Sequence, residues 1–493
     1  MNTFAHLIQN FMKVLSLLSN RWFIPLALFL LNFVLKVIYL DSNALGLDEP
    51  FSVYHAQMPV ADIVRIIYQG NNPPLFEVIL HFWIKLFGIS EFSVRFPSLL
   101  FSSLIAPVFY LIGTKLKHQS LGLVCALLFS FSNFHLYFAH EARVYALFAL
   151  LCCLSFYFFI SILKGDTQFK TKLFYVLFTS LLLYAHYFGF IVIGLHGLLL
   201  LVNIKLLKRS FRDWLLSYIA IFLLFLPSFI VLIKRFMISS SEGTWVKEPN
   251  GIQSVYSLIR HFSNEPVVAF LSIAGLLAFL VLFFKHRKEL AYQVAFIWFF
   301  VPVFMLLAIS YAVPMFVNRY LGFTSFGFYL MIGLSALYLY EKKAKRSLLV
   351  IPALFILAFM FTFKPNYKTL WNDKAVAELV KAEVPKGKTL LFCPDYYAPN
   401  FCYYFNRDYF KQYNTSKAFS TIHTLLHQDQ IIGLKSIANV DLSSKDEIYY
   451  LDAAANFSYP ENNILPSLRA EFNEVRQIEI GKDRTLYHFS RNQ

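Results

Sequence analysis

Long apolar runs separated by short polar segments dominate the chain between residues 22 and 363. Most are close to the roughly 20 residues that an α-helix needs to cross about 30 Å of hydrocarbon. We expect eleven membrane spans, near residues 22–40, 92–114, 120–139, 142–163, 173–188, 188–204, 214–233, 266–284, 290–312, 321–340 and 347–363. Before them, apolar residues at helical spacing in residues 1–20 predict a helix that lies on the membrane surface.

Basic residues gather between the apolar runs and predict which side of the membrane each connection faces. Short clusters of Lys and Arg lie at residues 115–117, 164–172, 205–212, 285–288 and 342–346. Cytoplasmic loops carry such an excess, so these clusters and the N-terminus are expected inside. The alternate connections then face outward, at residues 41–91, 139–142, 186–188, 234–265 and 313–320. An odd number of spans places the C-terminus outside.

The pattern changes at residue 364, where polar residues return and apolar residues break into short groups. Thr389–Cys393 and Glu447–Leu451 predict buried strands, and Lys374–Val384 predicts a helix. We therefore expect two domains, a transmembrane domain at 1–363 and a small extracytoplasmic α/β domain at 364–493. The fold class is a polytopic α-helical membrane protein with a small soluble domain.

Composition agrees with a membrane protein, because 58% of the residues are hydrophobic and only 15% are charged. The net charge of +15 is spread over short loops, which argues against a nucleic-acid partner. Of the five cysteines, Cys393 and Cys402 fall in the polar C-terminal region. Whether they form a disulfide in an oxidising compartment stays open at this stage.

The first outward loop, residues 41–91, carries the first candidate site. Asp48 and Glu49 follow directly after the first span, where a carboxylate can accept a proton from a sugar or lipid hydroxyl. The alternative is that this acidic pair only begins a solvated helix. The rest of the loop favours function, since Val60–Tyr68 and Leu75–Phe87 predict two amphipathic helices lying in the interface.

Two further outward turns carry titratable residues. His140, Glu141 and Arg143 follow the third span, and Arg319 and Tyr320 follow the ninth. A guanidinium binds phosphate bidentately, so both arginines suit an anionic ligand. The alternatives are that Glu141 and Arg143 decorate a helix start and that Arg319 reaches toward lipid headgroups. His186 and Tyr187 are a weaker candidate, since a lone His at a helix end is more often structural.

Taken together, these motifs resemble the bacterial branch of the GT-C superfamily of polyprenyl-phosphate-sugar-dependent glycosyltransferases, which is family 39-like. The resemblance is greatest to the protein O-mannosyltransferases and the lipid A aminoarabinose transferases. It rests on Asp48-Glu49, Asn72-Pro73-Pro74-Leu75 with the sequence to Gly88, Glu91 to Ser98, and His140 to Leu147. It covers residues 20–210 well, and later spans match mainly in pattern, with Arg319-Tyr320 as the anchor.

The resemblance implies roles for single residues. Asp48 matches the essential first-loop acid, Glu141 a second acid, and Arg319 the cation that contacts the donor phosphate. Asn72 departs from the basic residue that relatives often have before the two prolines, which puts a ligand contact from this position in doubt.

The expected function is transfer of a glycosyl group from a polyprenyl-phosphate sugar to a lipid, glycan or protein acceptor at the outer face of the bacterial inner membrane. Asp48 would act as the base, while Glu49, His140, Glu141, Arg143, Arg319 and Tyr320 would bind substrate. No cofactor or metal is predicted, although the carboxylates would allow a divalent cation. The alternatives are a polysaccharide polymerase or ligase and a lipid or glycan transporter. A transporter should carry its ionisable residues mid-membrane.

Overall fold

The computed structural model describes residues 22–46, 48–68, 70, 72–242, 246–369, 371–414, 419–438, 440–481 and 483–491. The surface helix expected within residues 1–20 lies outside these ranges. The described chain forms two compact units. The helical unit contains the residues up to Ile38, Tyr68–Phe76 and Arg95–Pro365, and the α/β unit contains Tyr39–Ile67, Glu77–Val94 and the chain from Asn366 onward.

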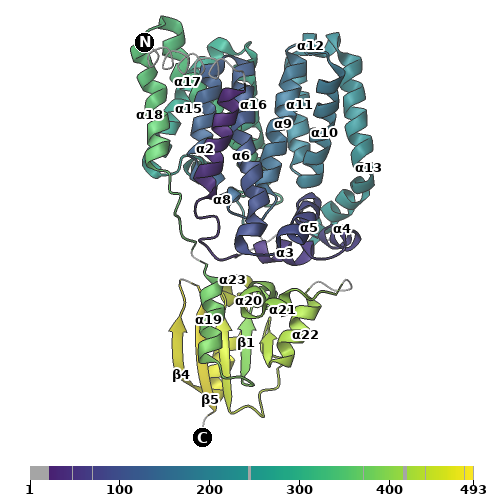
Figure 1. The fold of residues 1–493 in the computed structure, drawn as a ribbon, viewed down its shortest axis with the longest axis vertical. Helices are drawn as coiled ribbons and strands as arrows, with labels where there is room; N and C mark the ends of the chain where they lie inside the picture. Colours follow the sequence, from purple (N-terminus) through teal and green to yellow (C-terminus); the bar gives the residue numbers. More distant parts are fainter. Residues whose placement is uncertain are drawn as a thin grey trace, which may run out of the picture. The chain divides into compact units, whose positions relative to one another are not determined.

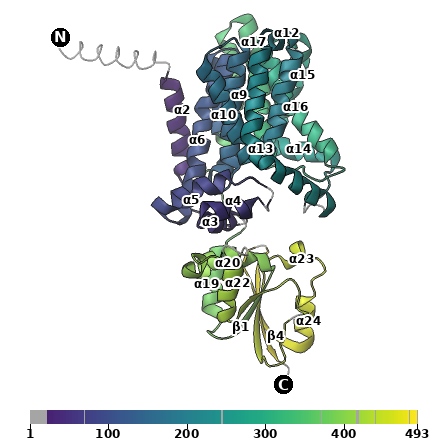
Figure 2. The ribbon, with the colours of Figure 1, turned by 90° about the vertical axis from the view of Figure 1, so that its right-hand side faces the viewer.

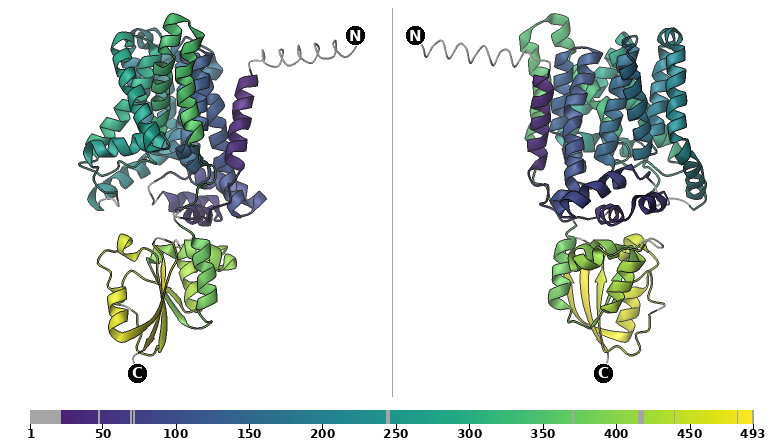
Figure 3. Two further views of the ribbon diagram at one scale, coloured as in Figure 1. Left: turned by 90° about the vertical axis from the view of Figure 1, so that its left-hand side faces the viewer. Right: turned by 45° about the vertical axis from the view of Figure 1, so that its right-hand side comes forward.

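The helical unit is built from helices that lie side by side in the views of Figures 1 and 3. Each predicted span coincides with a helix or a pair of helices. The helices of this unit are α2 (Phe23–Val37), α6 (Glu91–Leu116), α7 (Gln119–Ser130), α8 (Asn133–Ala139), α9 (Tyr145–Leu163), α10 (Phe169–Ala185), α11 (Gly189–Val202), α12 (Ile204–Arg209), α13 (Phe211–Glu242), α14 (Gly251–Phe262), α15 (Pro266–His286), α16 (Leu290–Ile309), η1 (Gly322–Thr324), α17 (Ser325–Lys343), η2 (Arg346–Leu349) and α18 (Val350–Phe361).

Six stretches in the described chain are long and apolar enough to cross a membrane, namely α6, α9, Phe211–Ile233 of α13, α15, α16 and Gly322–Lys343. The third predicted span is broken, because α7 and α8 meet at an angle of 64° and would together make a seventh. The helices α2 and α11 and the segment Arg346–Phe361 are apolar but shorter. Large apolar side chains are exposed along α2 and α13, as expected for helices that contact lipid.

Close packing holds the helical unit together where α16 and α17 cross. Gly327 of α17 lies against the α16 backbone, and a Cβ added there would be 2.7 Å from the nitrogen of Phe299. On the same helix as Phe299, Trp298 is fully buried and stacks on Phe156 of α9 with ring centroids 3.5 Å apart. Small residues at one crossing and aromatic stacking beside it fix the helices of this unit.

The α/β unit contains a five-stranded mixed sheet of order β2-β1-β3-β5-β4. Its strands are β1 (Thr389–Cys393), β2 (Ile431–Gly433), β3 (Glu447–Asp452), β4 (Phe472–Glu479) and β5 (Thr485–Arg491). Helices cover both faces of the sheet (Figures 2 and 3). They are α19 (Asp373–Glu383), η3 (Asp395–Tyr397), α20 (Ala398–Phe405), α21 (Arg407–Phe410), α22 (Ser420–Gln428), α23 (Ala455–Ser458) and α24 (Ile464–Glu471). The two predicted strands and the predicted helix are confirmed as β1, β3 and α19.

Strand β1 is paired on both sides, with β2 and β3 in parallel, and it is buried at every position because helices also cover both faces of the sheet. Cys393 in β1 and Cys402 in α20 are both buried and free, so the disulfide that the sequence left open is not formed. The first loop, residues 41–91, contributes α3 (Glu49–Ala56), α4 (Val60–Ile67) and α5 (Leu75–Phe87). The last two are the predicted amphipathic helices, whereas α3 was not predicted.

Candidate active site

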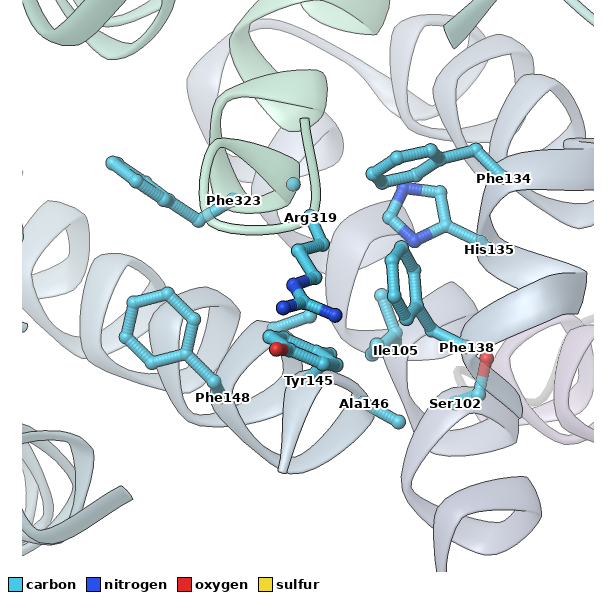
Figure 4. A pocket seen from close by; sticks show the side chains of 12 residues that line it. Ser102, Ile105, Phe134, His135, Phe138, Tyr145, Ala146, Phe148, Arg319 and Phe323 are labelled. Atoms are coloured by element: carbon cyan, nitrogen blue, oxygen red, sulfur yellow. The ribbon is translucent and has the colours of Figure 1, made fainter. Parts of the chain in front are cut away.

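A small pocket lies inside the helical unit, among α6, α8, α9 and the segment that precedes α17. Most of its wall is aromatic or aliphatic. The polar exceptions among its lining residues are Ser102, His135, Tyr145 and Arg319 (Figure 4). An apolar pocket with a few polar groups, one of them a cation, suits a ligand that joins an apolar part to an anionic one.

Arg319 supplies the positive charge of this pocket. Its guanidinium carbon lies 5.9 Å from the ring centroid of Tyr145 and 5.5 Å from that of Tyr320, within the range of cation–π attraction. Figure 4 shows the guanidinium group directed into the pocket above the Tyr145 ring. The predicted pair Arg319 and Tyr320 is therefore placed together, with Tyr320 supporting the cation from one side.

The turn at His186 meets the same group of aromatic side chains. The His186 ring lies 5.5 Å from that of Tyr320 and 5.0 Å from that of Phe148, and Phe148 lines the pocket. Its Nδ1 accepts a hydrogen bond from the Phe188 amide at 3.1 Å. His186 was a weaker candidate in the sequence, and the structure places its ring against Tyr320 and Phe148, outside the lining of the pocket.

Lys36 is a residue that the sequence reasoning missed. It lies in the last turn of α2, is fully buried, and donates from Nζ to Ser102 Oγ at 3.0 Å. Its Nζ also lies 4.3 Å from the ring centroid of Phe129. Among the described residues, no carboxylate lies within 4.0 Å of this ammonium group. Because Ser102 lines the pocket, this hydrogen bond connects Lys36 to the pocket wall. A lysine inside an apolar run was the signal that could have found it.

The turn at His140–Arg143 is buried in the helical unit. Glu141 is 6% exposed and Arg143 8% exposed, so neither decorates a solvated helix start. His140 Nε2 bonds to the carbonyl oxygen of Lys36 at 2.6 Å, which ties this turn to the end of α2. Because a carbonyl only accepts, Nε2 carries the proton in that bond. This bond gives His140 a structural contact, and its predicted role in substrate binding remains a prediction.

Asp48 and Glu49 lie in the α/β unit at the start of α3. Asp48 occupies the N-cap position, but its carboxylate makes no capping hydrogen bond. Glu49 is 4% exposed and accepts a hydrogen bond from the Gly46 amide at 3.3 Å. The simple explanation that Asp48 serves to cap a helix therefore fails, while Glu49 has at least a local structural role.

Glu77 is a second residue that the sequence reasoning did not select. Its carboxylate is buried in the α/β unit and accepts a hydrogen bond from Ser52 Oγ at 2.8 Å. Ser52 lies one turn after Asp48 on α3, and nearby His81 of α5 bonds to the Ala56 carbonyl at 2.8 Å. These bonds join α3 to α5. A Glu at the start of a helix that follows Pro73-Pro74 was the available signal.

In the described part of the chain, no group of three or more His, Cys, Asp or Glu side chains is arranged so that it could hold a metal ion.

Residues 71–232 match the family model of dolichyl-phosphate-mannose-protein mannosyltransferase. This segment runs from the first outward loop to α13 and includes the turn at 140–143. No curated protein matches the chain.

Solved structures match nearly the whole chain. The apo structure of ArnT from Cupriavidus metallidurans aligns with a TM-score of 0.59 at 12% identity, over 94% of this chain and 97% of that one. The same protein bound to undecaprenyl phosphate gives 0.58 at 12% identity, with the same coverage. The oligosaccharyltransferase of Archaeoglobus fulgidus in complex with Zn and sulfate gives 0.55 at 10% identity, over 95% of this chain and 73% of that one.

The chain shares the fold of ArnT and of the archaeal oligosaccharyltransferase, and the family model over residues 71–232 agrees with the resemblance to GT-C glycosyltransferases inferred from the sequence motifs. The predicted class of enzyme, a glycosyltransferase embedded in a membrane, agrees with the family model and with the solved structures.

Proposed function

We propose that the chain transfers one glycosyl group from a polyprenyl-phosphate-linked sugar to a lipid, glycan or protein acceptor at the outer face of the bacterial inner membrane. The observation that carries this proposal is the pocket of the helical unit. It combines an aromatic wall, which suits an isoprenoid chain, with the guanidinium group of Arg319, which suits a phosphate.

On the donor side, the bond between the sugar C1 and the phosphate oxygen breaks, and polyprenyl phosphate leaves. Negative charge grows on the phosphate during this step. Arg319 faces the pocket and stabilises the leaving group, and the hydrogen bond from Lys36 orients Ser102 in the pocket wall. Tyr145 and Tyr320 hold the guanidinium plane, so little reorganisation is required when the charge develops. Arg143, buried in the turn before α9, is the second predicted phosphate contact.

On the acceptor side, Asp48 accepts the proton of the acceptor hydroxyl as its oxygen attacks C1. Glu49 and Glu141 orient the sugar or the acceptor. The donor carries its own activation as a phosphate leaving group, so the reaction requires no nucleotide-binding domain.

The decisive experiment compares a deletion strain complemented with the wild-type protein, Asp48→Asn or Asp41→Asn. Lipid A, surface glycans and secreted proteins are examined by mass spectrometry. Asp41 is an exposed residue of the same loop and serves as the matched control. We expect one of the three pools to lose a glycosyl mass in the deletion strain, and only wild type and Asp41→Asn to restore it. Three unchanged pools would refute glycosyl transfer, and full rescue by Asp48→Asn would refute the base.

A further inference from the structure

The first outward loop forms a compact unit with the C-terminal domain. Residues 39–67 and 77–94 group with the chain from residue 366 onward, although more than 270 residues of helical unit separate them in sequence. The groups on the C-terminal domain that contact the loop come from α20, α21 and the segment leading to α22. We call them the loop-docking surface: Tyr403, Tyr404, Arg407, Phe410, Gln412 and Phe419.

The end of the loop is held at the turn between α5 and α6. The carbonyl oxygen of Ile89 accepts two hydrogen bonds, from Tyr403 OH at 2.5 Å and from Arg407 Nη1 at 3.0 Å. The Arg407 guanidinium lies 3.6 Å from the centroid of the Tyr403 ring, which keeps both donors aimed at one acceptor. Arg407 Nη2 also lies 3.9 Å from Glu91 Oε1. One carbonyl at a defined place in the loop is thus fixed from two sides.

The start of the loop is held around α3, immediately beside Asp48. Tyr404 OH bonds to the Leu45 amide at 2.6 Å, three residues before Asp48. At the far end of α3, Gln57 Nε2 donates to the Phe410 carbonyl at 3.1 Å and Tyr54 OH donates to the Gln412 carbonyl at 3.1 Å. Burial raises the pKa of Tyr54 to about 12, so this phenol keeps the proton that it donates.

Aromatic contacts close the same interface. Phe419 packs against Phe51, Tyr54 and His55, with ring centroids 5.7, 5.3 and 5.1 Å apart. These three residues lie along one side of α3, the helix that Asp48 begins. Polar bonds at both ends of α3 and an aromatic contact between them leave this helix little freedom to rotate or slide.

The loop-docking surface is itself held by a buried polar network. Asp373 is 1% exposed, accepts from Tyr397 OH at 2.8 Å and from Asn400 Nδ2 at 3.2 Å, and lies 3.7 Å from Arg484 Nε. Asn400 belongs to α20, which carries Tyr403 and Tyr404. Asp373, at the start of α19, therefore orients the helix that contacts the loop, with Arg484 beside it.

We propose that the C-terminal domain acts as a positioning element for the catalytic loop. Tyr403 and Arg407 are positioning residues that hold the turn after α5 at Ile89. The helix α5 in turn holds α3, and thereby Asp48, through the bonds of Glu77 to Ser52 and of His81 to the Ala56 carbonyl. The proposal rests on the proposed function, in which Asp48 is the base. The domain is then part of the catalytic apparatus, although the residues named here act through the loop and do not touch substrate.

The test uses the full-length protein in lipid nanodiscs and compares the double variant Tyr403→Phe/Arg407→Met with the control Tyr413→Phe/Lys411→Met. Tyr413 and Lys411 are exposed residues of the neighbouring segment. Hydrogen exchange of the amides in residues 43–57 and 84–94 reports how firmly the loop is held. We expect exchange there to rise about 10- to 30-fold in the double variant, since two hydrogen bonds are lost, and to stay unchanged in the control.

Turnover separates positioning from simple stability. We expect kcat to fall about tenfold in the double variant while the Kd for undecaprenyl phosphate stays within about twofold, because a misplaced base slows chemistry without weakening donor binding. The single variant Tyr404→Phe repeats the test if the double variant unfolds.

The outcomes are distinguishable. Unchanged loop exchange, or faster exchange with unchanged kcat, would overturn the positioning role. Exchange needs no turnover, so it decides whether the domain holds the loop even if the proposed reaction is wrong. The proposed reaction fails separately, if Asp48→Asn keeps full activity.

Discussion

Replacing Arg319 tests the pocket directly, because this residue supplies the guanidinium group that faces it. Arg319→Met removes the charge and the planar donor pair while keeping an apolar side chain of similar length. Arg319→Lys keeps the charge but loses the fork that binds a phosphate through two parallel bonds and stacks on Tyr145 and Tyr320. The pair of variants therefore separates charge from geometry.

The magnitude follows from the bonds at stake. Each charge-assisted hydrogen bond to a phosphate contributes about 1.5–3 kcal/mol. Loss of both in Arg319→Met corresponds to about 3–6 kcal/mol, or roughly 10²- to 10⁴-fold in affinity for undecaprenyl phosphate, at about 1.4 kcal/mol per tenfold. Arg319→Lys retains one bond and should lose roughly 10- to 150-fold.

Microscale thermophoresis with undecaprenyl phosphate in detergent measures this affinity. Arg260→Met is the control, because Arg260 is an exposed residue in the last turn of α14 and does not line the pocket. Binding by Arg319→Met within about twofold of wild type would refute Arg319 as the phosphate contact. Equal losses in Arg319→Met and Arg260→Met would mean that general surface charge, and not the pocket, attracts the lipid.

Three further variants address the base, the buried lysine and the helix packing. Asp48→Asn should lower kcat by about 10²- to 10⁴-fold, which is the usual contribution of a general base, whereas Asp41→Asn should leave kcat unchanged. Equal rates of the two variants in a glycosyl-transfer assay would contradict the mechanism. Lys36→Met should raise the thermal midpoint, because a buried cation costs roughly 3 kcal/mol in a membrane helix. The same variant should bind undecaprenyl phosphate more weakly. A lowered midpoint with unchanged binding would show that Lys36 is purely structural. Gly327→Ala should destabilise the protein by about 1–3 kcal/mol and lower its thermal midpoint, because the added Cβ meets the α16 backbone. The control Gly197→Ala places its Cβ where nothing lies within 4 Å, and it should be tolerated. Equal midpoints for the two variants would refute the close crossing.

A helix at each predicted span could be predicted from the sequence because a long apolar run has few alternatives to a buried or membrane helix. Of the eleven, only six stretches in the described chain, or seven with the bent pair α7 and α8, are long and apolar enough to cross a membrane. Strands β1 and β3 were predictable for a related reason, since both are buried on two faces and read as continuous apolar runs. The edge strand β4, Phe472–Glu479, was missed because it is mostly exposed and polar, so its sequence resembles a loop. Strand pairing depends on partners that are remote in the chain.

The candidate site was predicted in part. Arg319 and Tyr320 stand out in sequence because each is unusual at the end of an apolar run. Lys36 and Glu77 were missed because a single polar residue among apolar ones does not reveal which neighbour it faces. Lys36 has its partner Ser102 on another helix. The grouping of the first loop with residues 366–491 could not be read from the chain at all, since it depends on tertiary contacts such as that between Tyr403 and Ile89.

The discontinuous make-up of the α/β unit limits how this protein can be divided or recombined. A fragment beginning at residue 366 would leave Tyr403, Phe410 and Phe419 without the loop that covers them, and we expect it to self-associate through these aromatic groups. A chimera that exchanges the C-terminal domain between relatives must also exchange residues 39–67 and 77–94. Loop and domain are therefore expected to be inherited together, as one exchangeable module in two pieces.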